Sequence, residues 1–128
     1  MAEFYQSGHR QLQEEFQSTA LADRLEEIIV VPALDADAQT FISQQDHFFL
    51  TTVDADGFPT VSYKGGNTGF VQIVDETTLL FPCFDGNGMW LSMGNIADHE
   101  KIGMLFINTV EPHRIRVQGT ARLIRDPD

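Results

Sequence analysis

The sequence predicts a mainly β (α+β) protein in which six short antiparallel strands form a barrel, with helices before the strands and one helix inserted late among them. Residues 1–46 repeat apolar side chains at spacings of mostly three and four, as amphipathic helices do. From residue 47 onward the chain carries short runs of aromatic and β-branched residues, which favour strands. Too few helical segments separate these runs for a parallel sheet, which needs crossover helices.

The first helical segment is expected over residues 3–30. Its apolar positions are Leu12, Phe16, Leu21, Leu25, Ile28 and Ile29. Ser18 or Thr19 can divide the segment into two helices by capping the second one. Pro32 ends the segment, because the residue before a proline is kept out of the helical region.

Asp35 or Asp37 can cap one more short helix, after which the pattern changes to strands. Strands are expected at residues 48–53, 59–63, 70–74, 78–82, 102–107 and 114–123. Residues 54–57, Asp-Ala-Asp-Gly, form a hairpin turn, since the later acidic ligands of a calcium loop are missing. Residues 86–97 form the inserted helix, entered through a Gly-Asn-Gly turn.

Two parts follow from this pattern: a helical extension over residues 1–46 that packs on a barrel domain over residues 47–128. A hydrophobic content of 42% fits a globular protein with a core. Cys83, the sole cysteine, lies in an apolar stretch, so we expect a buried structural thiol and no internal disulfide. No apolar run approaches ~20 residues, and the first residues lack a secretion signal, so we expect a cytoplasmic protein.

The net charge of the chain limits the classes of binding partner that can be expected. Eight basic and 19 acidic residues give a formal net charge of −11. Nucleic acid and anionic membranes need clustered cations, so neither is an expected partner, and a small molecule is. The four histidines, which show no metal-ligand spacing, predict no metal site; they are His9, His47, His99 and His113.

Lys64 is the single basic residue between Arg24 and Lys101. It stands at the end of an apolar run and directly before Gly65 and Gly66, where a strand gives way to flexible backbone. A cation in that place suits an anionic ligand group. The alternative is a solvated lysine that guards a strand end.

A second candidate for ligand binding is the inserted helix. If Asn87 begins it, free backbone N–H groups and the positive end of the helix dipole lie at its first turn. Ser92 and Asn95 then share one face, and a phosphate could bind there with Lys64 as its counter-charge. The alternative is a capped helix whose apolar side chains pack on the barrel.

The order and spacing of several segments resemble the pyridoxamine 5′-phosphate oxidase-like family of FMN-binding split barrels. The segments are FLTTVDADGFPTVSYKGG at 49–66, GFV at 69–71, DGN at 85–87, SMGN at 92–95, IGMLFI at 102–107 and RVQG at 116–119. The resemblance runs from about residue 47 to residue 125. Residues 3–27 resemble a helical extension found in one uncharacterised branch of that family.

The resemblance implies a six-stranded antiparallel split β-barrel that forms a homodimer with two flavin sites at the subunit interface. Lys64 would then contact the FMN phosphate, and Phe81 and Pro82 would lie along the isoalloxazine ring. Asn87, Ser92 and Asn95 would hold phosphate or ribityl oxygens. The remaining positions implied for cofactor binding are Ser62 and Tyr63 on the second strand and Arg114 and Arg116 on the last strand, near the flavin or the interface.

Two departures from the family pattern shape the expected function. Many relatives carry an arginine at the start of the inserted helix, where this chain has Gly88, Met89 and Trp90. The chain also ends at Asp128 without the basic carboxy-terminal segment of the vitamin-forming oxidases, so we do not expect pyridoxamine-phosphate oxidation. The resemblance implies a flavin-dependent oxidoreductase for a small molecule. A protein that binds FMN, deazaflavin or haem without turnover, or a stress-related interaction module, is the alternative.

Overall fold

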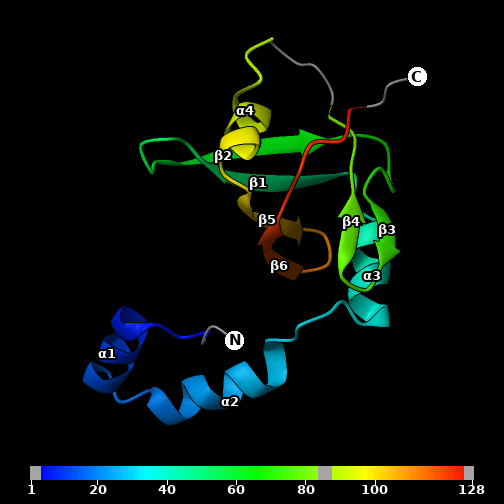
Figure 1. Ribbon diagram of the computed structural model, residues 1–128. Coiled ribbons are helices and arrows are strands. Elements are labelled where there is room, and N and C mark those ends of the chain that lie inside the picture. Colours follow the sequence, from blue (N-terminus) through cyan, green and yellow to red (C-terminus); the bar gives the residue numbers. More distant parts are fainter. Residues whose placement is uncertain (1–3, 84–87, 126–128) are drawn as a thin grey trace. The chain divides into compact units, whose positions relative to one another are not determined.

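The computed structural model describes residues 4–83 and 88–125, and the chain divides into two compact units, Met1–Leu34 and Asp35–Asp128 (Figure 1). The first unit is a pair of helices, α1 (Ser7–Glu15) and α2 (Thr19–Ile29). Ser18 is the N-cap residue of α2, which confirms a break at Ser18 and Thr19, although the Ser18 side chain forms no capping hydrogen bond.

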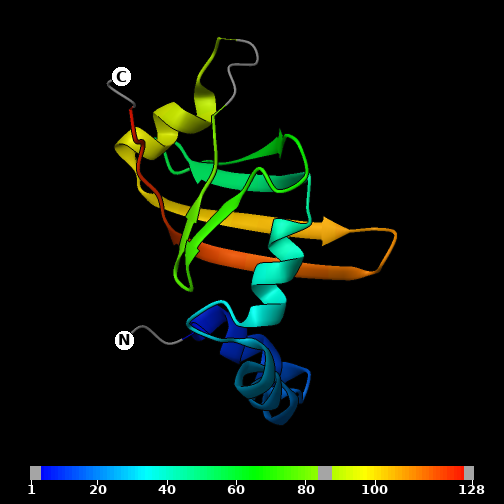
Figure 2. The ribbon, with the colours of Figure 1, turned by 90° about the vertical axis from the view of Figure 1, so that its right-hand side faces the viewer.

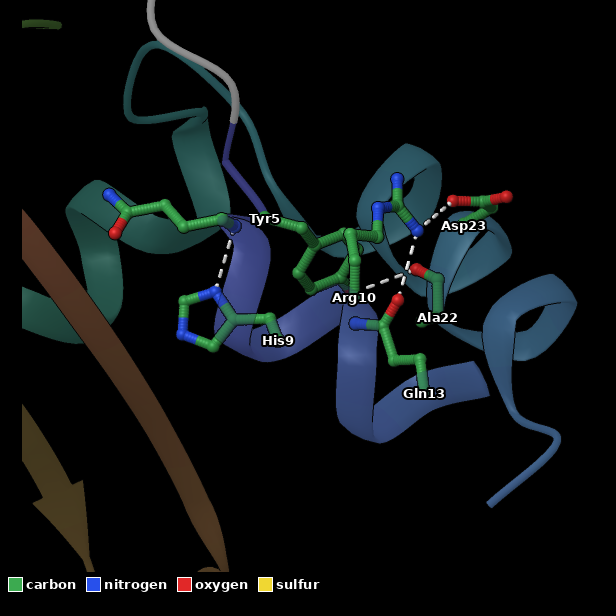
Figure 3. Close-up of polar contacts among 7 residues, drawn as sticks. Tyr5, His9, Arg10, Gln13, Ala22 and Asp23 are labelled. Atoms are coloured by element: carbon green, nitrogen blue, oxygen red, sulfur yellow. Dashed lines mark hydrogen bonds and ion pairs between the residues drawn. The ribbon is translucent and has the colours of Figure 1, made fainter. Parts of the chain in front are cut away.

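Polar contacts join the two helices of the first unit (Figure 3). The Tyr5 hydroxyl donates a hydrogen bond of 2.8 Å to the carbonyl oxygen of Ala22. The Arg10 guanidinium lies 2.6 Å from a carboxylate oxygen of Asp23 and 4.7 Å from the centre of the Tyr5 ring. The hydrogen bond to Asp23 raises the pKa of Arg10 above its ordinary value. These contacts fix the helix pair while leaving apolar side chains such as Phe16 and Ile28 exposed.

The second unit contains all six expected strands, in two antiparallel sheets. The larger sheet has the order β2-β1-β5-β6, and β3 pairs with β4 in the smaller one. The elements are α3 (Ala36–Ser43), β1 (His47–Val53), β2 (Pro59–Gly65), β3 (Gln72–Asp75), β4 (Thr78–Leu80), α4 (Leu91–Asp98), β5 (Lys101–Asn108) and β6 (His113–Thr120). The β3–β4 hairpin crosses the strands of the larger sheet steeply (Figure 2). The predicted mainly β split barrel is therefore confirmed.

Local sequence signals explain the ends of several elements. The Asp35 side chain accepts a hydrogen bond of 2.8 Å from the Ala38 N–H, so Asp35 is the cap of α3. In the β1–β2 turn, the Asp54 carboxylate accepts hydrogen bonds from Asp56 and Phe58, and Gly57 has φ +87°, a conformation that side chains disfavour. The expected hairpin turn is confirmed.

The inserted helix begins later than expected. Helix α4 starts at Leu91, and Trp90 is its N-cap residue, with φ 55° and ψ 31°. The prediction that the helix covers residues 86–97 was therefore wrong at its start. The chain between Gly88 and Trp90 is not helical, so the helix N-terminus lies about one turn further along than the Gly-Asn-Gly sequence suggested.

The core of the second unit lies on one face of the larger sheet. Side chains of β1 alternate, so that Phe48, Leu50 and Thr52 are fully buried while their neighbours along the strand are only half-buried. Phe48 is central, with its ring 5.0–5.8 Å from those of Phe70, Phe81 and Phe106. The remaining buried apolar side chains come from helices and loops as well as strands: Ile42, Val71, Met93, Ile96 and Met104.

Gly66 follows β2 at a point of close packing. A Cβ atom at this residue would lie 2.8 Å from the Phe70 ring, which itself stacks on Phe48. A side chain at residue 66 would collide with the Phe70 ring, so the packing of the aromatic core requires a glycine there. The Gly65-Gly66 pair therefore has a packing role in addition to providing flexible backbone after the strand.

Candidate functional site

A cavity of about 410 Å³ lies beside the end of β2 and the start of α4. Four stretches of chain line it: residues 62–65, residue 70, residues 82–83 and residues 88–93. Two of these stretches are joined directly, because the hydroxyl oxygens of Ser62 and Ser92 share a hydrogen bond of 2.7 Å that links β2 to α4. The two segments that the sequence predicted separately as ligand-binding, the end of β2 and the start of α4, therefore line one cavity.

Lys64 supplies the charge of this cavity. On β2 it lies opposite Phe48, whose side chain is buried, so strand alternation directs Lys64 to the core side of the sheet. Lys64 is half-buried and forms no ion pair with any residue that the structure describes. Among the described residues lining the cavity, Lys64 is the only charged one. The described residues therefore give its ammonium group no counter-ion.

Much of the rest of the cavity wall is apolar. It includes Phe70 and Pro82, together with Met89, Trp90 and Leu91 from the segment that enters α4. The last three side chains are exposed, although each is large and hydrophobic. The cavity consequently combines one cation and the hydroxyl groups of Ser62 and Ser92 with a broad apolar surface, the composition typical of small-molecule sites.

Asn95 serves the packing of α4 instead of lining this cavity. Its side-chain amide donates a hydrogen bond of 3.1 Å to the Thr52 hydroxyl, and that hydroxyl lies 2.7 Å from the hydroxyl of Thr60. Asn95 and Thr52 are both buried. Buried polar groups are almost always hydrogen-bonded, and here they find their partners within the protein. The resulting network joins α4 to β1 and β2.

Replacement of Thr52 with valine is expected to lower the free energy of unfolding by about 1–3 kcal/mol, because the Asn95 amide would lose its partner while remaining buried. Chemical denaturation would measure the change. Thr51→Val is the matched control, since Thr51 lies on the same strand but is only half-buried and faces away from the core. Equal effects of the two substitutions would show that the hydrogen bond contributes nothing.

Five of the ten residues implied for cofactor binding line the cavity: Ser62, Tyr63, Lys64, Pro82 and Ser92. Asn95 and Phe81 lie elsewhere, in the contacts with Thr52 and Phe48 described above. Tyr63 reaches the cavity at the edge of β2, but its ring is stacked on His47, 5.6 Å away. Asn87 falls outside the described residues.

Arg114 and Arg116 are not brought to the cavity within one chain. Both are exposed on β6, which forms the edge of the sheet opposite β2. Each alternates with half-buried residues of β6, so the two arginines share the face of the sheet that points away from the core.

The expectation that Cys83 is buried was wrong, because Cys83 is exposed and lines the cavity. Strand β4 ends at Leu80, so Cys83 no longer follows the alternation that would have buried it. Phe70 was missed as a cavity residue for another reason: it precedes β3, and only the fold places it on the same cavity wall as Lys64.

The outward face of the larger sheet carries a separate polar pair. The Asp46 carboxylate lies 2.8 Å from Nδ1 of His47, and this hydrogen bond holds the pKa of Asp46 below its ordinary value. Within residues 4–83 and 88–125, no group of three or more His, Cys, Asp or Glu side chains is arranged to hold a metal ion. No helix in the same ranges has the length and apolar character needed to cross a membrane.

Comparison with known proteins identifies proteins similar to this chain. A family model described as pyridoxamine 5′-phosphate oxidase matches residues 34–128. Two crystal structures of group A Streptococcus HupZ, one of them a histidine-to-alanine variant, are 25% identical to the chain, with TM-scores of 0.54 and 0.53. Each match covers 68% of this chain, and 67% or 63% of the HupZ chain. No curated protein matches the sequence.

Proposed function

The chain belongs to the pyridoxamine 5′-phosphate oxidase-like family, and on this premise we propose that it is a flavoprotein whose cavity beside Lys64 binds FMN. The fold of this family commonly binds flavin or haem. The observation that carries the proposal is the composition of the cavity wall. A lone ammonium group and paired hydroxyls stand near an apolar aromatic surface, which matches a planar ring that bears a phosphate.

The phosphate of FMN would bind at Lys64 and at the Ser62–Ser92 pair. In that pair one hydroxyl donates to the other, so the proton of the second hydroxyl is free for an acceptor in the cavity. No acidic side chain is among the described residues of the cavity wall, so none of these residues repels an anion. Local donors thus offset the formal net charge of −11.

The proposed activity is that of an oxidoreductase acting on a small molecule. A bound flavin supplies hydride or electron transfer, and the protein positions the ring and controls its surroundings. The apolar wall would exclude water from one side of the ring, while Lys64 would fix the far end of the ligand. The cavity volume of about 410 Å³ lies within the range of small-molecule sites.

We further propose that the protein is a homodimer that associates through the outward face of the larger sheet. Val61 and Tyr63 are exposed there, beside half-buried Phe49, Leu105 and Ile107. A group of apolar side chains on one face of a sheet is typical of an interface between subunits. The exposed arginines of β6 lie on the same face, so a partner subunit could bring them near a flavin site.

Val61→Glu is expected to convert the dimer into a monomer, because it places a charge within the apolar face. Light scattering coupled to gel filtration would show the mass fall from twice 14.4 kDa to 14.4 kDa. Val110→Glu is the control, since Val110 is 90% exposed in the β5–β6 turn and lies outside this face. A wild-type protein that elutes as a monomer would overturn the proposed dimer.

Haem is the second candidate ligand. Cys83 places an exposed thiol on the cavity wall, and a cysteine thiolate is a known ligand of haem iron. Mass spectrometry and the absorption spectrum of the purified protein separate the candidates. FMN with a flavin spectrum supports the proposal, whereas a haem mass with a Soret band would redirect it. A yellow protein that no nicotinamide cofactor reduces would indicate a flavin carrier or sensor.

A further inference from the structure

Trp90 has an unusual backbone conformation. With φ 55° and ψ 31° it lies in the left-handed region, and among the described residues only Gln17 is another non-glycine with positive φ. A bulky aromatic residue is disfavoured in that region, where glycine or asparagine is common. The Trp90 side chain also provides no capping hydrogen bond to α4. Neither the backbone conformation nor helix capping explains a tryptophan at this position.

The surroundings of Trp90 point to a ligand. Its side chain is 51% exposed and lines the cavity, between two further exposed apolar residues, Met89 and Leu91. Lys64 and the Ser62–Ser92 hydroxyl pair line the same cavity. Tyr63 cannot provide an equivalent aromatic wall, because its ring is stacked on His47. Among the described residues of the wall, Trp90 has the largest flat side chain.

We propose that Trp90 determines specificity by stacking its indole on the planar ring of the ligand, an inference that rests on the proposed FMN site. Trp90 then selects a flat aromatic ring, while Lys64 selects the phosphate. The two contacts act on different parts of one molecule. Substitution of Trp90 therefore affects FMN and riboflavin alike, since both carry the isoalloxazine ring and only FMN carries a phosphate.

The test measures dissociation constants for FMN and riboflavin by ultrafiltration of the full chain. Trp90→Leu is expected to weaken both ligands by the same factor, about 3- to 10-fold, because an apolar side chain remains but the aromatic stack is lost. Trp90→Phe should weaken both ligands less. Phe58→Leu is the matched control, an aromatic-to-leucine change at a residue that is 69% exposed and outside the cavity wall.

Emission of the bound flavin provides a second readout. Trp90 is the only tryptophan of the chain, and an indole in van der Waals contact quenches flavin fluorescence by electron transfer. Bound FMN should be nearly dark in the wild-type protein and brighter in both Trp90 variants, so Trp90→Phe keeps the test decisive if Trp90→Leu does not fold. Wild-type protein that retains no FMN would overturn the proposed function and this inference together. Tight FMN binding with equal affinity and emission in wild type and Trp90 variants would overturn only the role of Trp90.

Discussion

Replacing Phe48 with alanine is expected to lower the free energy of unfolding by about 3–5 kcal/mol, the cost of deleting a large buried aromatic side chain and leaving a cavity. Phe48 is 0% exposed, and its ring contacts Phe70, Phe81 and Phe106. These neighbours come from β5 and from the loops that flank the β3–β4 hairpin, so one substitution loosens both sheets.

Denaturant titration followed by circular dichroism would measure this loss. Phe58→Ala is the control, because Phe58 is exposed, and its replacement should change the free energy of unfolding by no more than about 0.5 kcal/mol. A Phe48 variant as stable as wild type would contradict the aromatic core described above. The same variant should bind FMN weakly even when folded, because Phe70 is part of the cavity wall.

Replacing Lys64 with alanine is expected to weaken FMN binding roughly 10- to 150-fold, the value of a charge-assisted hydrogen bond to a phosphate. The effect is large because Lys64 is the only charged residue among the described ones that line the cavity. Riboflavin, which lacks the phosphate, should bind the variant and the wild-type protein equally. The dependence of FMN affinity on salt should also become slightly weaker, since one screened cation is removed.

Lys101→Ala is the matched control for Lys64, because Lys101 is an exposed lysine at the start of β5 and is not part of the cavity wall. Isothermal titration calorimetry would give both dissociation constants. Unchanged FMN affinity in the Lys64 variant would place the phosphate elsewhere in the protein. Equal losses for FMN and riboflavin would show that Lys64 supports the fold of the cavity and does not recognise the phosphate.

The sequence predicts the strands well, because each strand is defined by local alternation. Phe48, Leu50 and Thr52 repeat every second residue and face the core together. The cap of α3 was also predictable, since Asp35 satisfies an N–H group only three residues away. The start of α4 was not predictable in this way. Its N-cap residue is a tryptophan in the left-handed region, and no local sequence preference favours that arrangement.

The candidate site was predictable only where residues close together in the sequence form it. Lys64 was found from its isolation in an acidic chain, and strand alternation explains its place in the cavity. Asn95 was assigned to a ligand because it shares a helix face with Ser92, yet the fold uses its amide for Thr52 on β1. Contacts between residues more than 40 positions apart depend on how α4 packs against the sheet, which local patterns do not specify.

The most direct test of FMN binding at this cavity is equilibrium dialysis of the purified protein, freed of any co-purified ligand, against FMN. Saturable binding that approaches one FMN per chain, with riboflavin bound more weakly, is the expected result. Lys64→Ala should remove the preference for FMN over riboflavin, and Lys101→Ala should preserve it. A protein that retains no FMN at saturating concentrations would contradict the proposal that this cavity binds FMN.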